Sequence, residues 1–365
     1  MRIVLMLVAA LALAGGAVMS QAREALAATP GSGARIIGAV KTVTPVNQIN
    51  RGAVGPVPVF VKLPDTSGGF KASVELQAAS LKSLIERAVI EKKEDDGFNR
   101  PLDTYVVVTG RDGAQAVFSW GEIFLAGDGM RVVVADRARL LMPHHHKPVG
   151  MDVYDTVAWM TPGERATRSI ESCATCHDGA EHRRLVMPQG IIVAAPSDPW
   201  PPRTLDGVES IEVRQIGVKV EGAKGGATRS EKVTLRTADG VERPFAATVA
   251  GLPRGEVRDA VVGMSRGFKG VHAASGVRLR PLVEKLLARG TPLRSVVVLV
   301  TGSDGYRAVV SGGELERDEA LLADREDGTP LAGADGRYRL VLGGDAFIDR
   351  SIRAVREIRV IQPQQ

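Results

Sequence analysis

The sequence predicts a mixed α+β fold that occurs twice in tandem along the chain. The segment "VVVTGRDGAQAVFSWGEI" (106–123) recurs as "VLVTGSDGYRAVVSGGEL" (298–315) at a constant offset of 192. In each segment an apolar, β-branched run, an Asp-Gly turn and an alternating run follow one another, which predicts a β-hairpin. A stretch with apolar residues at helical spacing precedes each hairpin, so both secondary-structure types are expected in each copy.

The predicted helices are "SLKSLIERAVIEKK", which begins at residue 80, and "RLRPLVEKLLARG", which begins at residue 278. In the second, Gly290 is the expected C-cap. The copies end in the apolar runs "GVESIEVRQIGV" and "AVREIRVIQ", which are predicted to be closing strands.

A large insertion is predicted in the first copy. The segment 197–216 aligns with 344–363 at an offset of 147, whereas the hairpins differ by 192, so about 45 extra residues lie between Ile123 and Val193. We therefore expect a first repeat over residues 28–215, interrupted at about 142–190, and a second repeat over residues 216–365.

Residues 1–27 have the composition of a secretory signal peptide. One arginine precedes an apolar run from Ile3 to Val18, and small residues follow, so cleavage is expected after Ala22 or Ala27. The apolar run is shorter than the roughly 20 residues that span a bilayer, although a retained anchor is the alternative. The sequence thus predicts export to a bacterial periplasm without a stable membrane anchor.

Both cysteines of the chain lie in "SCATCHDG" (172–179), where Cys173 and Cys176 are followed by His177. Cys-x-x-Cys-His is the attachment motif of c-type haem: two thiols bond to the porphyrin vinyl groups and the histidine binds the iron. A disulfide or thiol-exchange site, and a zinc site that also uses the histidines at 144–146, are the alternatives. We predict one covalent haem c, attached through Cys173 and Cys176, with His177 as the proximal ligand.

The distal iron ligand is expected from the insertion. The stretch "HHHKPVGMDVYD" resembles the "HPVG" segments with distal histidines in multihaem cytochromes, although Lys147 follows His146 where the pattern has proline. On that resemblance His146 is the first candidate and His145 the second. Met187 is the third, because Met-Pro is common at the distal ligand of small cytochromes c. In the alternative, the three histidines lie in a solvated loop without contact to the iron.

The order of a helix, a "VVVTG-x-DG" hairpin, a "GGEL"-type turn and a closing "VREIRV" strand resembles the molybdopterin-binding domain of the sulfite oxidase superfamily. The resemblance implies a molybdopterin-binding-like fold in both copies and is strongest over about 270–362. In that family a cysteine thiolate binds the molybdenum, but both cysteines here belong to the haem motif, so molybdopterin is not expected. Arg203 and Arg350 recur at the offset of 147 and are expected to form salt bridges within the fold.

Composition narrows the function classes. The net charge is +5, from 47 Lys and Arg against 42 Asp and Glu, but the basic residues are scattered and aromatics are only 4 %, so nucleic-acid binding is not expected. No dinucleotide fingerprint and no Walker sequence is present.

We therefore expect an electron-transfer protein with one haem c and a redox partner protein, and we do not expect an enzyme. The alternatives are a haem-bearing subunit of a periplasmic oxidoreductase complex, and a haem enzyme or sensor with an open distal site.

Overall fold

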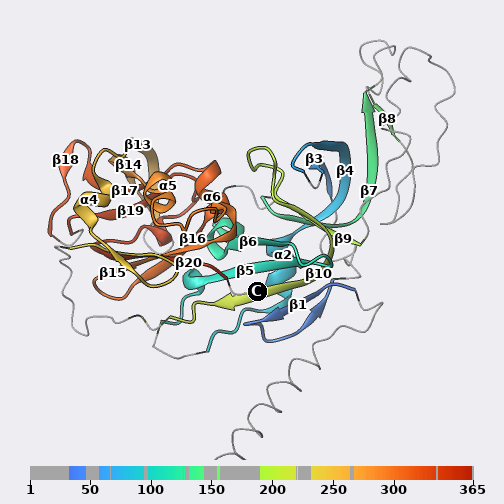
Figure 1. Ribbon diagram of the computed structural model, residues 1–365, viewed down its shortest axis with the longest axis horizontal. Coiled ribbons are helices and arrows are strands. Elements are labelled where there is room, and N and C mark those ends of the chain that lie inside the picture. The colour runs from blue at the N-terminus through green and yellow to red at the C-terminus, as the bar shows by residue number, and fades with distance from the viewer. Residues whose placement is uncertain are drawn as a thin grey trace, which may run out of the picture. The chain divides into compact units, whose positions relative to one another are not determined.

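The computed structural model confirms the mixed α+β class, with many strands and a few short helices among the described residues (Figure 1). The described residues are 33–46, 57–65, 67–93, 98–125, 127, 131–143, 154–156, 190–218, 220, 232–263, 267–333 and 336–363. The predicted signal peptide, residues 1–27, lies outside them. Residues from Ala34 to Gln365 form one compact unit.

The first half of this unit is built on a ten-stranded sheet. Its main path is β2-β1-β10-β9-β7-β4-β3, and off this path β5 pairs with β10, β6 with β5, and β8 with β7. The strands are β1 (Arg35–Gly38), β2 (Thr44–Pro45), β3 (Val57–Pro64), β4 (Phe70–Ser80), β5 (Thr104–Gly110), β6 (Gln115–Ser119), β7 (Val133–Pro143), β8 (Tyr154–Thr156), β9 (Ile191–Ala194) and β10 (Thr204–Gln215). The helices are α2 (Leu81–Ala88), the 3-10 turn η1 (Pro101–Asp103) and α3 (Trp120–Phe124).

The second half has two five-stranded sheets, β12-β11-β20-β15-β16 and β13-β14-β17-β18, the latter with β19 paired to β17. Its strands are β11 (Thr234–Arg236), β12 (Glu242–Arg243), β13 (Arg254–Gly263), β14 (Gly267–Arg278), β15 (Val297–Gly302), β16 (Arg307–Ser311), β17 (Ala320–Glu326), β18 (Thr329–Pro330), β19 (Arg339–Leu342) and β20 (Val355–Ile361). Its helices are α4 (Phe245–Val249), α5 (Leu279–Glu284), η4 (Leu293–Ser295), α6 (Gly312–Arg317) and η6 (Ile348–Arg350).

The first strand of each half runs parallel to its last strand. Arg35 in β1 is the partner of Ser210 in β10, and Thr234 in β11 is the partner of Glu357 in β20. The predicted hairpins are present in both halves as β5–β6 and β15–β16, and the predicted closing strands are β10 and β20. Both hairpin predictions and both closing-strand predictions are therefore confirmed.

The strand ladders that precede α2 in the first half and α5 in the second have an irregularity at the same place. The register of β4 against β7 shifts between Gln77 and Ala78, and that of β14 against β17 shifts between Ser275 and Gly276. These positions are 198 apart, as are the first residues of α2 and α5, Leu81 and Leu279. The halves differ in one strand pairing. β9 lies between β7 and β10 and pairs with both, whereas β19 pairs with β17 and not with β20 among the described strands.

The predicted helices are shorter than their apolar patterns. Helix α2 ends at Ala88, because Val89 has a φ of 57° and Ile90 forms a β-bridge with Val40. Helix α5 ends at Glu284, so the prediction that Gly290 caps it is wrong; Gly290, with a φ of 84°, lies in a later turn.

The "GGEL"-type segments are helices rather than turns. Helices α3 and α6 each begin with a capping box, Ser119 with Glu122 and Ser311 with Glu314. In this motif the serine oxygen accepts from a backbone N–H of the first turn and the glutamate accepts from the backbone N–H of the serine.

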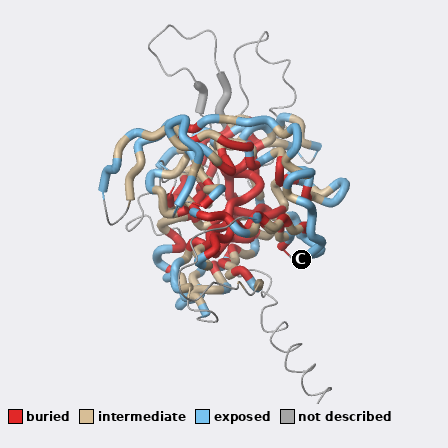
Figure 2. Tube along the Cα trace, turned by 90° about the vertical axis from the view of Figure 1, so that its left-hand side faces the viewer, coloured by how far each residue is buried: buried red, intermediate tan, exposed pale blue. Residues whose placement is uncertain are grey.

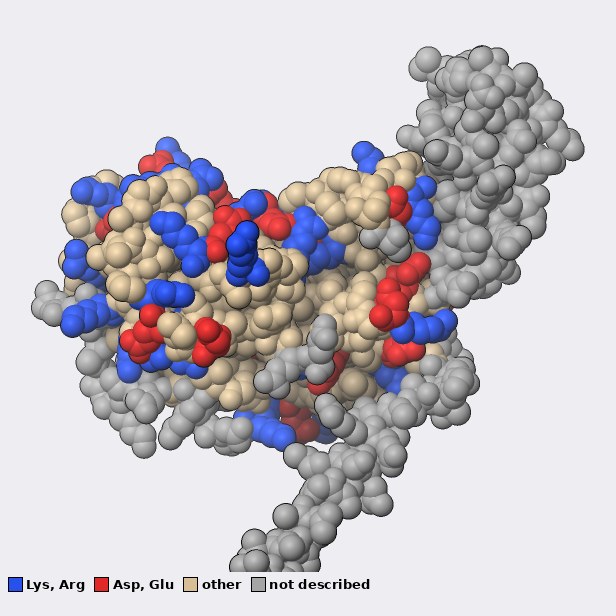
Figure 3. Space-filling view, in the orientation of Figure 1, with Lys and Arg blue, Asp and Glu red and all other residues tan. Residues whose placement is uncertain are grey.

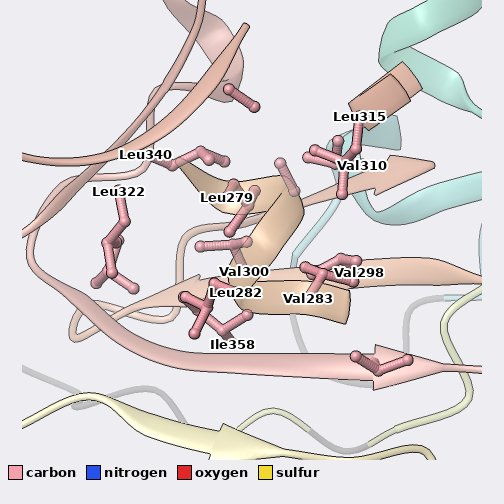
Figure 4. Close-up of a cluster of buried hydrophobic side chains, with 14 of the residues drawn as sticks. Leu279, Leu282, Val283, Val298, Val300, Val310, Leu315, Leu322, Leu340 and Ile358 are labelled. Atoms are coloured by element: carbon pink, nitrogen blue, oxygen red, sulfur yellow. The ribbon is translucent and has the colours of Figure 1, made fainter. Parts of the chain in front are cut away.

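Each half has its own apolar core, around α2 in the first half and around α5 in the second. Buried residues gather in the interior of the described chain (Figure 2). In the second half, Leu279, Leu282 and Val283 of α5 pack against strands of the β20-β15-β16 sheet, including Val298, Val300 and Ile358 (Figure 4). In the first half, residues of α2 join the corresponding strands, and the members include Leu81, Leu84, Ile85, Val106, Val108 and Ile211. Among the described residues, no helix is long and apolar enough to cross a membrane.

Candidate functional site

The residues predicted to bind haem lie outside the described residues. This holds for the attachment residues Cys173 and Cys176, for the proximal candidate His177, and for the distal candidates, which are His146, His145 and Met187. The structure describes the strands from which this segment departs and to which it returns.

Those strands, β7 and β9, are neighbours in the sheet. Ala135 of β7 is the partner of Ile192 of β9, although 57 positions separate them along the chain. In the second half the corresponding pair is Ala323 of β17 and Arg339 of β19, which are only 16 positions apart. The first half therefore has about 41 extra residues between two adjacent strands, close to the number expected from the sequence offsets. Beyond Ala135, β7 continues to Pro143 and pairs with β8.

The two halves pack against each other through their hairpins. Six of the seven buried residues at this contact are alternate positions of the hairpins: Tyr105, Val107 and Val117 from the first half, and Val297, Leu299 and Val309 from the second; the seventh is Ile216. Each residue of the first set is 192 positions before one of the second set, so corresponding faces of the two hairpins meet each other. Side chains that alternate along a strand point to the same face, which is why every second residue takes part.

A buried ion network lies at the same contact, around Arg203. The guanidinium binds Asp198 at 2.6 Å and Glu122 at 3.2 Å, and it donates to the carbonyl of Val117 at 2.8 Å. The residue is only 5 % exposed. The hydroxyl of Ser311, from the other half, donates to Glu122 at 2.7 Å.

Arg350 occupies the corresponding position in the second half. It binds Asp345 at 2.8 Å and Glu314 at 3.0 Å, and it donates to the carbonyl of Val309 at 3.4 Å. Ser119 of the first half donates to Glu314 at 2.9 Å. The prediction that Arg203 and Arg350 form salt bridges within the fold is confirmed.

Two glycines make room for these arginines. A Cβ on Gly121 would lie 2.1 Å from Nε of Arg350, and a Cβ on Gly313 would lie 2.3 Å from Cζ of Arg203. Each glycine is in the first turn of one half's helix, α3 or α6, and the arginine comes from the other half. Glycine is required where another group approaches the backbone this closely.

The two glutamates of the network differ in electrostatic environment. Burial raises the pKa of Glu122, but Arg203 and Arg317 outweigh that effect and hold it at about 2. Burial also raises the pKa of Glu314, and Arg350 offsets this only in part. This difference arises from the sequence. Arg317, which forms an ion pair with Glu122, lies 192 positions after Leu125, so the first half has a leucine where the second half has this arginine. Glu314 therefore has no counterpart of Arg317.

The network is suited to holding the halves together rather than to chemistry. Arg203, Glu122, Arg350 and Glu314 are buried, and each is paired with oppositely charged side chains of the network. Sequence reasoning found the two arginines but not Ser119, Glu122, Ser311 or Glu314. The signal was available, since Ser-x-x-Glu in "SWGE" and "SGGE" is a capping box in both copies.

A second group of ionisable residues surrounds a pocket of the second half, with a cavity volume of about 140 Å³. Its wall includes His272 of β14, Glu326 of β17 and Arg339 of β19. The imidazole Nδ1 of His272 lies 2.8 Å from Asp327 and 3.3 Å from Glu326. The side-chain hydrogen bond to Asp327 raises the pKa of His272. Sequence reasoning did not single out these residues.

Charged side chains of both signs are interspersed over the described surface seen in Figure 3.

No family model and no curated protein matches this chain. Among solved structures, the chain is similar to the sulfane dehydrogenase SoxCD from Paracoccus pantotrophus, with 14 % sequence identity and a TM-score of 0.29. The match covers 47 % of this chain and 47 % of that chain, so this chain spans about half of its length.

Proposed function

We propose that this protein is a periplasmic c-type cytochrome with one haem, which carries electrons to or from a redox partner protein. The observation that supports this most strongly is the lone Cys-x-x-Cys-His motif, Cys173 to His177, in a chain that begins with a signal-peptide-like segment. Two thiols and an imidazole at this spacing are the donor set that covalent haem requires. The haem would supply reversible one-electron chemistry at its iron.

The roles of the chain's own residues follow from that donor set. Cys173 and Cys176 would hold the porphyrin, and His177 would bind the iron. A second iron ligand would come from a side chain of the insertion, with His146 ahead of His145 and Met187. Ligand identity and burial then set the reduction potential.

We further propose that the scaffold consists of two copies of one molybdopterin-binding-like fold that bind no molybdopterin. The shared element order, the two parallel first-to-last strand pairs and the matching ion networks around Arg203 and Arg350 support the duplication. The chain has no cysteine besides Cys173 and Cys176, so no thiolate is left to bind molybdenum.

The haem segment is proposed to be an insertion into the first copy. The 57 positions between Ala135 and Ile192, against 16 in the corresponding pair, support this. Because β7 and β9 are adjacent, a segment of any length between them leaves the sheet pairing unchanged. A haem-binding segment is therefore compatible with an intact scaffold.

The proposal is tested by covalent attachment. The full-length protein is produced with the cytochrome c maturation machinery, and the variants Cys173→Ala and Cys176→Ala are compared with Ser172→Ala as a matched control in the same segment. Wild type and the control should retain haem peroxidase staining on a denaturing gel and give a haem c spectrum in a pyridine haemochrome assay. A wild-type protein without covalent haem would refute the proposal.

The two alternatives give different results in the same preparation. A haem enzyme or sensor with an open distal site would bind carbon monoxide readily in the ferrous state, which a six-coordinate iron does not. A subunit of a periplasmic oxidoreductase complex would co-purify with a catalytic subunit at a fixed stoichiometry.

A further inference from the structure

The His272 pocket lies where the first half has a filled apolar core. His272 is six residues before Arg278, the N-cap of α5, and Val74 is six residues before Ser80, the N-cap of α2. The strand partners agree with this correspondence, since His272 pairs with Asp259 and Val74 pairs with Val61.

The neighbouring strands extend the same correspondence. Glu326 is the partner of Ala274, and the corresponding partner of Leu76 is Ala138. The four polar positions of the pocket, Asp259, His272, Glu326 and Arg339, thus match Val61, Val74, Ala138 and Ile192 of the first half. All four of the latter residues are at most 4 % exposed and belong to one apolar cluster. At these four positions the fold is therefore apolar in the first half and ionisable in the second.

Donor atoms of three side chains come together here: two belong to the pocket wall, His272 and Glu326, and the third is the neighbouring Asp327. The Nδ1 of His272, a carboxylate oxygen of Glu326 and a carboxylate oxygen of Asp327 all lie within 4.8 Å of one another. A tetrahedral site with metal bonds of about 2.0–2.2 Å places its donors roughly 3.3–3.5 Å apart. The separation of 3.3 Å between His272 and Glu326 meets this requirement, and that of 2.8 Å between His272 and Asp327 needs to open by about 0.5 Å.

The second oxygen of each carboxylate is held by another group. Arg339 binds Oε2 of Glu326, while Oε1 faces His272. The backbone N–H of Ala273 donates to Oδ1 of Asp327 at 2.8 Å, while Oδ2 faces His272. Such outer contacts orient the ligands of metal sites and keep their free oxygens directed at the ion.

The charges around this point come from several elements. Asp259 of β13 lies opposite His272, Lys269 of β14 provides a carbonyl 3.4 Å from Nε2, and Arg339 and Arg353 also line the pocket. The His272 side chain is 32 % exposed and that of Asp327 is 54 % exposed, so the donors are accessible from solvent. The cavity leaves room for water ligands at an ion bound here.

We propose that His272, Glu326 and Asp327 form a binding site for a divalent transition-metal ion such as Zn²⁺. One imidazole nitrogen and two carboxylate oxygens are ligands that Zn²⁺ accepts, and water completes the coordination. None of the three residues belongs to the haem motif: His272 is on β14, Glu326 is on β17, and Asp327 is in the turn that follows β17.

The test counts bound Zn²⁺ in the full-length protein by competition with a chromophoric chelator. His272→Ala should bind one equivalent fewer than wild type. Asp327→Asn retains the acceptor for Ala273 and tolerates the φ of 49° at this position, so it should fold and bind this equivalent at least about tenfold more weakly. Asp324→Asn is the matched control and should bind as wild type, because Asp324 lies on β17 like Glu326 but forms an ion pair with Arg254 of β13.

Counting by difference separates this site from any Zn²⁺ bound at the histidines 144–146, which all three variants retain. Circular dichroism of each variant shows whether it is folded. Equal stoichiometry and affinity for wild type and folded His272→Ala would overturn the proposal, and the cluster would then be a hydrogen-bonded imidazolium between two carboxylates.

Discussion

The hydroxyl of Ser119 donates a hydrogen bond to Glu314 at 2.9 Å, although Ser119 is the N-cap of one half's helix and Glu314 belongs to the capping box of the other. Ser311 and Glu122 make the reciprocal bond at 2.7 Å. Each half therefore completes the polar network of the other, as in a two-fold symmetric interface between identical subunits. Disturbing one half at this contact should leave charges of the other half buried and unpaired.

The first prediction concerns the glycines against which the arginines pack. Gly121→Ala and Gly313→Ala should each destabilise the protein by about 3 kcal/mol or more, because a Cβ displaces a buried guanidinium from its carboxylates. Urea unfolding measures the effect. Gly217→Ala, which places its Cβ in open space, should stay within about 0.5 kcal/mol of wild type. Equal stability of all three variants would contradict the packing described.

The second prediction compares two matched glutamates. Glu122→Gln should destabilise the protein more than Glu314→Gln at pH 7. Glu122 forms ion pairs with two arginines, Arg203 and Arg317, whereas Glu314 forms an ion pair with Arg350. Removing one partner of a buried ion pair costs about 3–5 kcal/mol, and the cost grows with the positive charge left unpaired. Unfolding free energies in the reverse order would show that Arg317 does not act on Glu122.

The third prediction is a pH dependence. Because the folded-state pKa of Glu122 is about 2 against an ordinary value of 4.5, its ionisation stabilises the fold above about pH 4.5, and this stability is lost as the pH falls toward 2. The loss from this group is on the order of 3 kcal/mol. Glu314 has a raised pKa and acts in the opposite direction, with its contribution present at low pH and lost as the pH rises.

Arg317→Leu tests this dependence, since leucine is the residue at the corresponding position of the first half, Leu125. The variant should lose stability at pH 7 and show a shallower decline between pH 4.5 and 2. Urea unfolding at several pH values measures both. An unchanged slope would mean that Arg203 alone holds the pKa of Glu122 down.

The fourth prediction follows from the cysteine inventory. The purified protein should contain about one iron atom per chain and no molybdenum, because its two cysteines are used by the haem motif. The measurement is elemental analysis of protein produced in cells that make both haem c and molybdopterin. Stoichiometric molybdenum would contradict the proposal that the scaffold lacks that cofactor.

The fifth prediction identifies the distal ligand. His146→Ala should lose low-spin character in the ferric spectrum and gain carbon monoxide binding, while the haem stays attached. His145→Ala serves as the neighbouring control and should remain low-spin. An unchanged spectrum for His146→Ala, together with an open site in Met187→Ala, would assign the ligand to methionine.

The sequence was informative wherever a pattern repeats at short range. The hairpins around Asp112-Gly113 and Asp304-Gly305 were predicted correctly, because turn residues and alternating apolar strands are local signals. Helix ends were predicted poorly, because α2 stops where Ile90 bridges to Val40, a partner distant in sequence. Propensity within a segment contains no information about such a partner.

The two candidate sites differ in the same respect, because one is a local sequence motif and the other depends on strand pairing. Cys173, Cys176 and His177 form a contiguous motif, so the haem prediction needed no fold. The pairing of β14 with β17 brings together His272, Glu326 and Asp327. No spacing in the sequence predicts this strand pairing. The reciprocal contact of Ser119 with Glu314 likewise depends on how the two halves pack.

The parallel pairing of β1 with β10 has a consequence for how the chain folds. Arg35 and its partner Ser210 are 175 positions apart, and the whole segment that is proposed to bind haem lies between them in the sequence. The central part of the first sheet can close only after all of that segment has emerged and β10 has arrived. Because contacts of such long sequence separation slow folding, the first half is expected to acquire its structure late.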